Sequence, residues 1–126
     1  MNVQERIAEL TRRMLRRKLY AVLSKPLVPE EKLKGHLVEH LEYLIDLEKR
    51  GVLFVSGPLT DVGGSPLSGV GLTVLRVTSE AEARQIAEAE PFAKNGLRAF
   101  EINEWTIMEG TLGLRVSLSD QSVEIY

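Results

Sequence analysis

The sequence contains no cysteine, and this absence removes several classes of protein from consideration. A disulfide framework, a thiolate metal site, an iron–sulfur cluster and a cysteine nucleophile are all excluded. No apolar run reaches about 20 residues, the length that a membrane helix needs. The first residues also lack the continuous apolar segment of a signal peptide. We therefore expect a cytoplasmic protein with no membrane partner.

An excess of one charge is also missing, since 16 basic side chains face 18 acidic ones for a net charge of -2. This balance gives no global case for binding nucleic acid. The 126 residues, 44% of them hydrophobic, suit one compact domain of ordinary globular composition. The charge is unevenly spread, however. Residues 1–18 carry six basic and two acidic groups, so a basic end of +4 precedes an acidic remainder of -6.

Apolar residues near the N-terminus recur at spacings of four, three and four: Val3, Ile7, Leu10 and Met14. This spacing predicts an amphipathic helix over about residues 2–17. Such a helix packs either on the body of the protein or on a second subunit, or it serves as a membrane or transit segment. Two glutamates and the lack of aromatic residues favour packing.

The middle of the chain alternates between strand and helix patterns. Residues 18–27 are typical of a strand, and Pro29 then opens a helix that ends near Gly51. Its predicted core face consists of Leu33, Leu37, Leu41, Leu44 and Ile45. Residues 52–55 and 71–78 are predicted strands, and the proline- and glycine-containing segment 58–70 is a predicted mobile loop.

Ser79 and Glu82 form a capping box that begins a second helix, which Pro91 limits to about residue 89. A turn at Asn95-Gly96 precedes a long strand over 97–108. The order strand–helix–strand–strand–helix–strand predicts an α+β fold of the ferredoxin-like βαββαβ type. The alternation over 112–118 adds a fifth strand, alone or in a hairpin with 122–126. We therefore divide the chain into an N-terminal helix (1–17), a ferredoxin-like domain (18–108) and a C-terminal β extension (109–126).

A four-stranded sheet with two helices on one side leaves its other face bare. An exposed apolar face on so small a domain needs a cover. Two copies placed sheet to sheet would provide it. We therefore expect a homodimer from the architecture alone.

Only two histidines are present, His36 and His40, one turn apart on the first predicted core helix. In the simpler interpretation, His40 borders the core and His36 is exposed. Residues 36–40 also match the pattern H-x-x-E-H, in which two imidazoles on one helical face share a metal. The pattern is weakly specific, and a third ligand would have to come from elsewhere. A metal site is therefore the less favoured interpretation.

The glycine-rich residues 63–71 do not form a phosphate-binding loop. No Lys-Ser/Thr pair ends the stretch, and it leads into a strand, so no helix N-terminus faces an anion. We expect a hairpin loop that folds over a pocket, and no bound cofactor. Since no serine lies in a G-x-S-x-G elbow, a histidine with a carboxylate is the only general-base arrangement on offer.

Several short motifs, in order and at matching spacing, resemble the YCII-related (YciI-like) family. They are His40-Leu41, Gly51, the run Leu53-Phe54-Val55-Ser56-Gly57-Pro58-Leu59, Glu90-Pro91-Phe92, Gly96-Leu97 and the strand that carries Trp105. The resemblance covers about residues 18–108. It implies a dimeric α+β barrel of ferredoxin-like subunits and a site built on a histidine–aspartate pair.

In this resemblance His40 matches the histidine, whereas Glu90 stands where the family has aspartate. Glutamate keeps the charge and adds a methylene, so the pair either survives with shifted geometry or is lost. The family further implies dehydrochlorinase-like, lyase or isomerase chemistry. A base removes a proton next to a carbonyl or enol, and elimination or double-bond migration follows.

Our first functional hypothesis is a cofactor-independent lyase or isomerase that acts on a small cyclic or aromatic-derived substrate. His40 is its expected base, Glu90 orients His40, and residues 58–70 form a lid. The expected substrate-binding residues are His36, Ser56, Gly57, Pro58 and Phe92. One alternative is a non-catalytic dimeric module that binds a small metabolite, which the departure at Glu90 favours. The other is a metal-dependent enzyme that uses His36 and His40.

Overall fold

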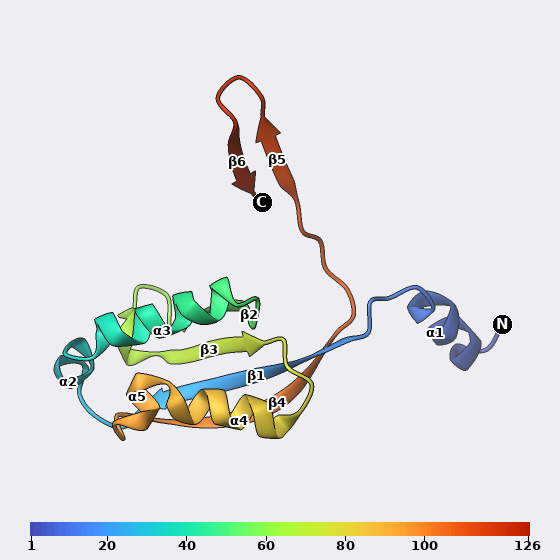
Figure 1. Cartoon of the computed structure of the whole chain (residues 1–126). Coiled ribbons are helices and arrows are strands. Elements are labelled where there is room, and N and C mark those ends of the chain that lie inside the picture. The colour runs from blue at the N-terminus through green and yellow to red at the C-terminus, as the bar shows by residue number, and fades with distance from the viewer. The chain divides into compact units, whose positions relative to one another are not determined.

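The computed structural model describes all 126 residues, and the chain divides into two units (Figure 1). The larger unit spans Lys18–Thr106. The smaller unit combines Met1–Arg17 with Ile107–Tyr126. Neither unit contains a helix with the length and apolar character needed to cross a membrane.

Four strands form the sheet of the larger unit: β1 (Arg17–Pro26), β2 (Leu53–Leu59), β3 (Val70–Leu75) and β4 (Arg98–Ile107). Their order across the sheet is β2-β3-β1-β4, and β3 pairs antiparallel with both β1 and β2. The helix α3 (Leu37–Lys49) connects β1 to β2, and α4 (Glu80–Ala89) connects β3 to β4. This interleaved order confirms the predicted ferredoxin-like α+β fold.

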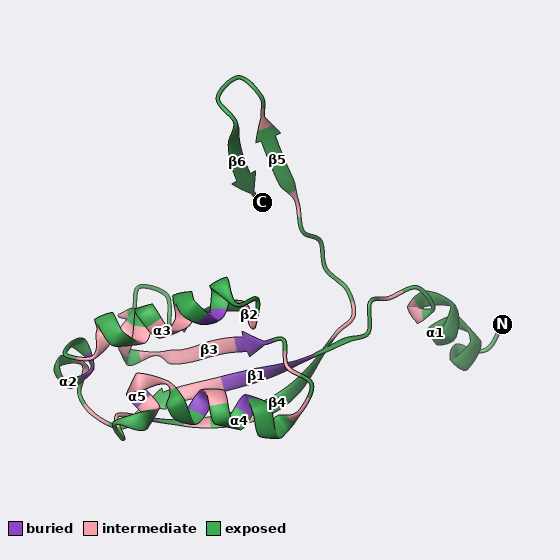
Figure 2. Cartoon of the chain, viewed as in Figure 1, coloured by how far each residue is buried: buried purple, intermediate pink, exposed green.

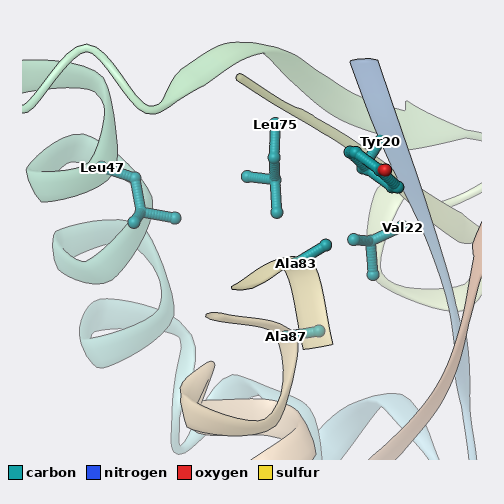
Figure 3. Close-up of a cluster of buried hydrophobic side chains, with 6 residues drawn as sticks. All are labelled: Tyr20, Val22, Leu47, Leu75, Ala83 and Ala87. Atoms are coloured by element: carbon teal, nitrogen blue, oxygen red, sulfur yellow. The ribbon is translucent and has the colours of Figure 1, made fainter. Parts of the chain in front are cut away.

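One face of the sheet packs against α3 and α4. Tyr20, Val22 and Leu75 point from the strands toward Leu47 of α3 and toward two small residues of α4 (Figure 3). Leu47 and Leu75 are completely buried. The small side chain of Ala83, also completely buried, lets the backbone of α4 approach the sheet closely.

The opposite face of the sheet carries the alternate residues of the same strands. Ala21 on β1 and its partner Val74 on β3 are buried there. Val55 on β2 and Trp105 on β4 remain 50% and 43% exposed. This face therefore keeps large apolar side chains in contact with solvent in the single chain.

The helix predicted after Pro29 is two helices, because the chain breaks at Gly35 and His36. The first is α2 (Glu30–Lys34), and α3 follows it. Glycine has a low helix propensity, and the break resets the helical phase. Counting from Leu33 therefore misplaces the later residues. Leu41 and Ile45 are 47% and 49% exposed, whereas the completely buried residue of α3 is Leu47.

The predicted loop 58–70 is partly regular. Strand β2 continues to Leu59, a short 3-10 helix η1 covers Pro66–Ser68, and β3 begins at Val70. The Ser65 hydroxyl donates to a carboxylate oxygen of Glu30 at 2.6 Å, which ties the loop to α2. Pro58 lies on β2, which is an edge strand of the sheet, and edge strands are where sheets tolerate proline.

The second predicted helix begins and ends as the sequence indicates, but another short helix follows it. Ser79 accepts a hydrogen bond from the Glu82 backbone N–H, and α4 ends at Ala89. The helix α5 (Pro91–Lys94) then begins with proline in its first turn. Proline suits this position because the first N–H groups of a helix have no intrahelical partner. Glu90 lies between the two helices in extended conformation.

The smaller unit holds the helix α1 (Val3–Thr11) and a hairpin of β5 (Leu114–Ser117) and β6 (Ser122–Ile125). The hairpin confirms the strand that the alternation over 112–118 predicts. The helix is shorter than predicted, since it ends at Thr11 and Arg16 adopts a positive φ of 52°. No residue of α1, β5 or β6 is buried, and Figure 2 draws these elements in green and pink only.

Candidate functional site

A cavity of about 340 Å³ lies in the larger unit, between the sheet and the helices that cover it. Six of the residues singled out from the sequence line it: His40, Ser56, Gly57, Pro58, Glu90 and Phe92. They come from α3, β2 and the α4–α5 junction, so only the folded chain brings them together. Most of the remaining wall is aliphatic and aromatic, which suits a small, largely apolar ligand.

The position of Glu90 follows from its role at the start of α5. Its Oε2 accepts hydrogen bonds from the backbone N–H groups of Phe92 and Ala93, at 3.1 and 3.2 Å. These bonds satisfy two of the donors that a helix start leaves without partners. The second carboxylate oxygen, Oε1, is thereby free to face α3.

His40 meets that oxygen from the first turns of α3. Its Nδ1 lies 2.5 Å from Oε1 of Glu90. The imidazole stacks on the ring of Phe92 with centroids 4.3 Å apart. Both side chains of the pair are largely shielded, with 23% of His40 and 16% of Glu90 exposed. The stack and the hydrogen bond together fix the plane of the imidazole.

The pairing determines which histidine nitrogen is available for chemistry. A carboxylate is a hydrogen-bond acceptor, so Nδ1 of His40 carries the proton of the neutral ring. The lone pair then resides on Nε2, which makes no hydrogen bond within the protein. A histidine held in this way by a carboxylate has the geometry that a general base requires. The extra methylene of glutamate is accommodated with the hydrogen bond intact.

His36 lies apart from this arrangement. It is the N-cap residue of α3 and is not among the residues that line the cavity. Its Nδ1 is 3.7 Å from a carboxylate oxygen of Glu39 and has no hydrogen-bond partner. No group of three or more histidine, aspartate or glutamate side chains is placed to hold a metal ion. The fold therefore places no third ligand beside His36 and His40, which the metal-dependent alternative would need.

Arg98 is a cavity residue that the sequence reasoning missed. Only 6% of it is exposed, and its guanidinium donates to Ser24 on β1 and to carbonyls of Leu67 and Gly69. Burial lowers the pKa of Arg98, and the nearby charge of Glu90 opposes that shift. The two-residue alternation of the strand could have indicated that Arg98 points inward. Arg98 shares the inward-facing positions of β4 with Phe100 and Ile102.

Tyr43 adds a polar group on the α3 side of the cavity. Its hydroxyl donates to the Ile86 carbonyl at 2.7 Å and so links α3 to α4. Burial raises the pKa of the phenol, with smaller effects from Arg50, Glu90 and Asp46. The hydroxyl is therefore a fixed structural donor of this wall.

Comparisons with known proteins agree with this architecture. The family model of the YCII-related domain matches residues 18–106. A similar solved structure is that of 5-chloro-2-hydroxyhydroquinone dehydrochlorinase from Burkholderia phenoliruptrix AC1100, in complex with 2,5-dihydroxybenzoquinone. The two chains are 24% identical with a TM-score of 0.59, and the match covers 69% of this chain and 92% of that one. No curated protein matches the sequence.

Proposed function

This chain belongs to the YCII-related family, and from that premise we propose that it is a cofactor-independent lyase or isomerase. Its substrate is a small cyclic or aromatic-derived molecule with a proton next to a carbonyl or enol. His40 removes this proton, and Glu90 keeps His40 in the reactive tautomer. The reaction takes place in the cavity of the larger unit.

One observation carries the proposal: the contact of 2.5 Å between His40 Nδ1 and Glu90 Oε1 at the wall of an apolar cavity. A histidine that served only to fill the core would need no carboxylate from another helix. A carboxylate that served only to cap α5 would need no partner beyond the two N–H groups. The pair satisfies the geometric requirement for a general base held by an orienting group.

In the proposed reaction, Nε2 of His40 takes the proton from carbon, and the electron pair moves into the carbonyl to form an enolate. The proton on Nδ1 remains on His40 and is not transferred to Glu90. The Glu90 carboxylate stabilises the resulting imidazolium. In a lyase, the enolate collapses with loss of a leaving group such as chloride, and the imidazolium of His40 releases its proton to solvent. In an isomerase, His40 returns the proton to a different carbon.

The test begins with 5-chloro-2-hydroxyhydroquinone. This compound appears in the name of the dehydrochlorinase whose solved structure is similar to this chain. Chloride release is measured for the wild type and for His40→Gln. We expect the rate to fall about 10²- to 10⁴-fold, the usual contribution of a general base. The matched control is His36→Gln, one turn away and outside the cavity lining, which should keep the wild-type rate.

Other results would favour the alternatives. If His40→Gln retains the wild-type rate, His40 is not the base. If the wild type binds such compounds without turning them over, the domain is a binding module. If His36→Gln is as damaged as His40→Gln and added metal raises the wild-type rate, the two histidines act through a metal.

We further propose that the larger unit forms a homodimer through the sheet face that bears Val55 and Trp105. These exposed apolar residues give a second copy a surface to cover. Light scattering should give twice the chain mass for the wild type, and Val55→Asp should shift the protein toward monomer. Val38→Asp is the control, since Val38 is exposed on α3 rather than on the sheet. A monomeric wild type would end this proposal.

A further inference from the structure

Arg98 is the one charged residue of the chain that is buried. All of its hydrogen bonds go to neutral acceptors. Nε donates to the Ser24 hydroxyl, Nη1 to the Leu67 carbonyl, and Nη2 to the carbonyls of Ser24 and Gly69. No carboxylate lies within ion-pair distance of the guanidinium. A buried charge without a partner of opposite sign is unusual, because desolvation penalises it.

The hydrogen-bond inventory of this guanidinium is incomplete by one donor. Arginine presents five N–H groups, and the four bonds use one on Nε, one on Nη1 and two on Nη2. One N–H of Nη1 is therefore left without a protein acceptor. Arg98 lines the same cavity as His40 and Glu90, so a bound ligand can reach it.

The charge of Glu90 does not remove the need for an anion. Its carboxylate already accepts from His40 and from two backbone N–H groups. With His40 neutral, the cavity wall holds one positive and one negative charge. The negative charge is thus engaged by His40 and α5, whereas the positive charge of Arg98 meets neutral acceptors only. Arginine stays protonated throughout, since a guanidinium keeps its proton in proteins.

We propose that the cavity selects a small organic anion and that the Arg98 guanidinium is its charge partner. The recognised group is a carboxylate, or an enol that is ionised at neutral pH. This assignment rests on the proposed function for the place of the ligand, and it names the ligand's charge. Arg98 acts here as a specificity-determining residue, with Nη1 donating to the anion and the carbonyls of Leu67 and Gly69 holding the guanidinium in place.

The test compares two probes of nearly the same shape, the anion 2,5-dihydroxybenzoate and the neutral 2,5-dihydroxybenzamide. Calorimetric titration of the full chain measures both affinities and needs no turnover. We expect the wild type to bind the carboxylate at least about tenfold more tightly than the amide, as for a charge-assisted hydrogen bond. Arg98→Gln should bring the two affinities within about threefold of each other.

The control is Arg115→Gln, which removes the same charge from the exposed hairpin strand β5 and should keep the preference. Should Arg98→Gln fail to fold by circular dichroism, NMR of the wild type replaces it. The carboxylate should then shift the Arg98 guanidinium resonance and the amide should not.

Three results would overturn the assignment: equal or tighter binding of the amide, no binding of either probe at about 5 mM, or a folded Arg98→Gln that keeps the preference. Each is separate from the proposed function, whose failure is seen in the rates of the His40 variants. Rates that depend on His40, together with equal binding of the two probes, would leave that function standing and refute the anion.

Discussion

Replacing Glu90 by glutamine tests whether this carboxylate determines the tautomer of His40. The carboxylate accepts three hydrogen bonds, two from the start of α5 and one from His40. Glutamine has a single carbonyl oxygen and an NH₂ group that only donates. It can therefore satisfy either the helix or the histidine, and the other partner then faces a donor.

The magnitudes indicate which orientation glutamine adopts. With its oxygen toward α5 it keeps two bonds to backbone N–H groups, and with its oxygen toward His40 it keeps one. Each bond contributes about 1 kcal/mol, and a buried N–H without a partner costs a further 1–3 kcal/mol or so. The first orientation is thus favoured. Its NH₂ group then donates to Nδ1 of His40, which moves the ring proton to Nε2 and removes the proposed base.

We expect Glu90→Gln to lower the free energy of unfolding by about 1–2 kcal/mol, because charged hydrogen bonds become neutral ones. Any His40-dependent rate should fall about 10²-fold or more. The decisive assay is the ¹⁵N NMR spectrum of the imidazole, which distinguishes the two tautomers without a substrate. A spectrum in which Nδ1 still carries the proton in the folded variant would refute the reasoning.

The variant Glu90→Asp separates the cap from the histidine contact. Aspartate is a good N-cap residue, so the stability should stay within about 0.5 kcal/mol of the wild type. Its carboxylate is shorter by one bond, about 1.5 Å, which takes it beyond hydrogen-bond distance of His40. We therefore expect a stable protein with a lowered rate. An unchanged rate would mean that the contact with His40 is not needed.

Four further variants probe the scaffold, and denaturant unfolding measures each of them. Leu47→Ala should cost about 2–5 kcal/mol, because this completely buried side chain leaves a cavity in the core; a loss below 1 kcal/mol or so would contradict its placement. Gly69→Ala should cost about 1–3 kcal/mol, because an added Cβ would lie 2.5 Å from a carbonyl oxygen of β2, whereas Gly57→Ala, with nothing within 4 Å, should be neutral. Tyr43→Phe should cost about 1 kcal/mol through the lost bond to Ile86. Since burial raises the pKa of Tyr43 above its usual 10.0, the wild type's advantage is full below pH 10.0 and should shrink as the pH rises further; a constant difference would argue against a buried phenol.

Much of the fold follows from local signals. The cap at Ser79 and the proline at 91 set both ends of α4, and strict alternation indicates the β5–β6 hairpin. These features depend on neighbouring residues only, so a sequence contains them. The break at Gly35 is different. Its consequence, the shift of the buried position to Leu47, depends on how α3 packs against the sheet.

The candidate site also has features that the sequence predicts and features that only the fold shows. A histidine on the first core helix and a carboxylate before Pro91 could be singled out as a pair from the sequence pattern and the family resemblance. The contact between them could not, because it needs α5, an unexpected four-residue helix that holds Glu90 through its N–H groups. His36 was grouped with the site by its spacing in the sequence, and its place as the N-cap residue of α3 leaves it outside the cavity lining.

The sequence by itself determined the order of the elements, the absence of thiol chemistry and the presence of only two histidines. Those properties depend on composition and on spacing along the chain. Only the tertiary structure decided that Arg98 is buried in the cavity, because its partners Ser24 and Leu67 lie 74 and 31 residues away in sequence. A strand pattern indicates that a residue points inward, but what surrounds it depends on which distant segments the sheet and the loop bring together.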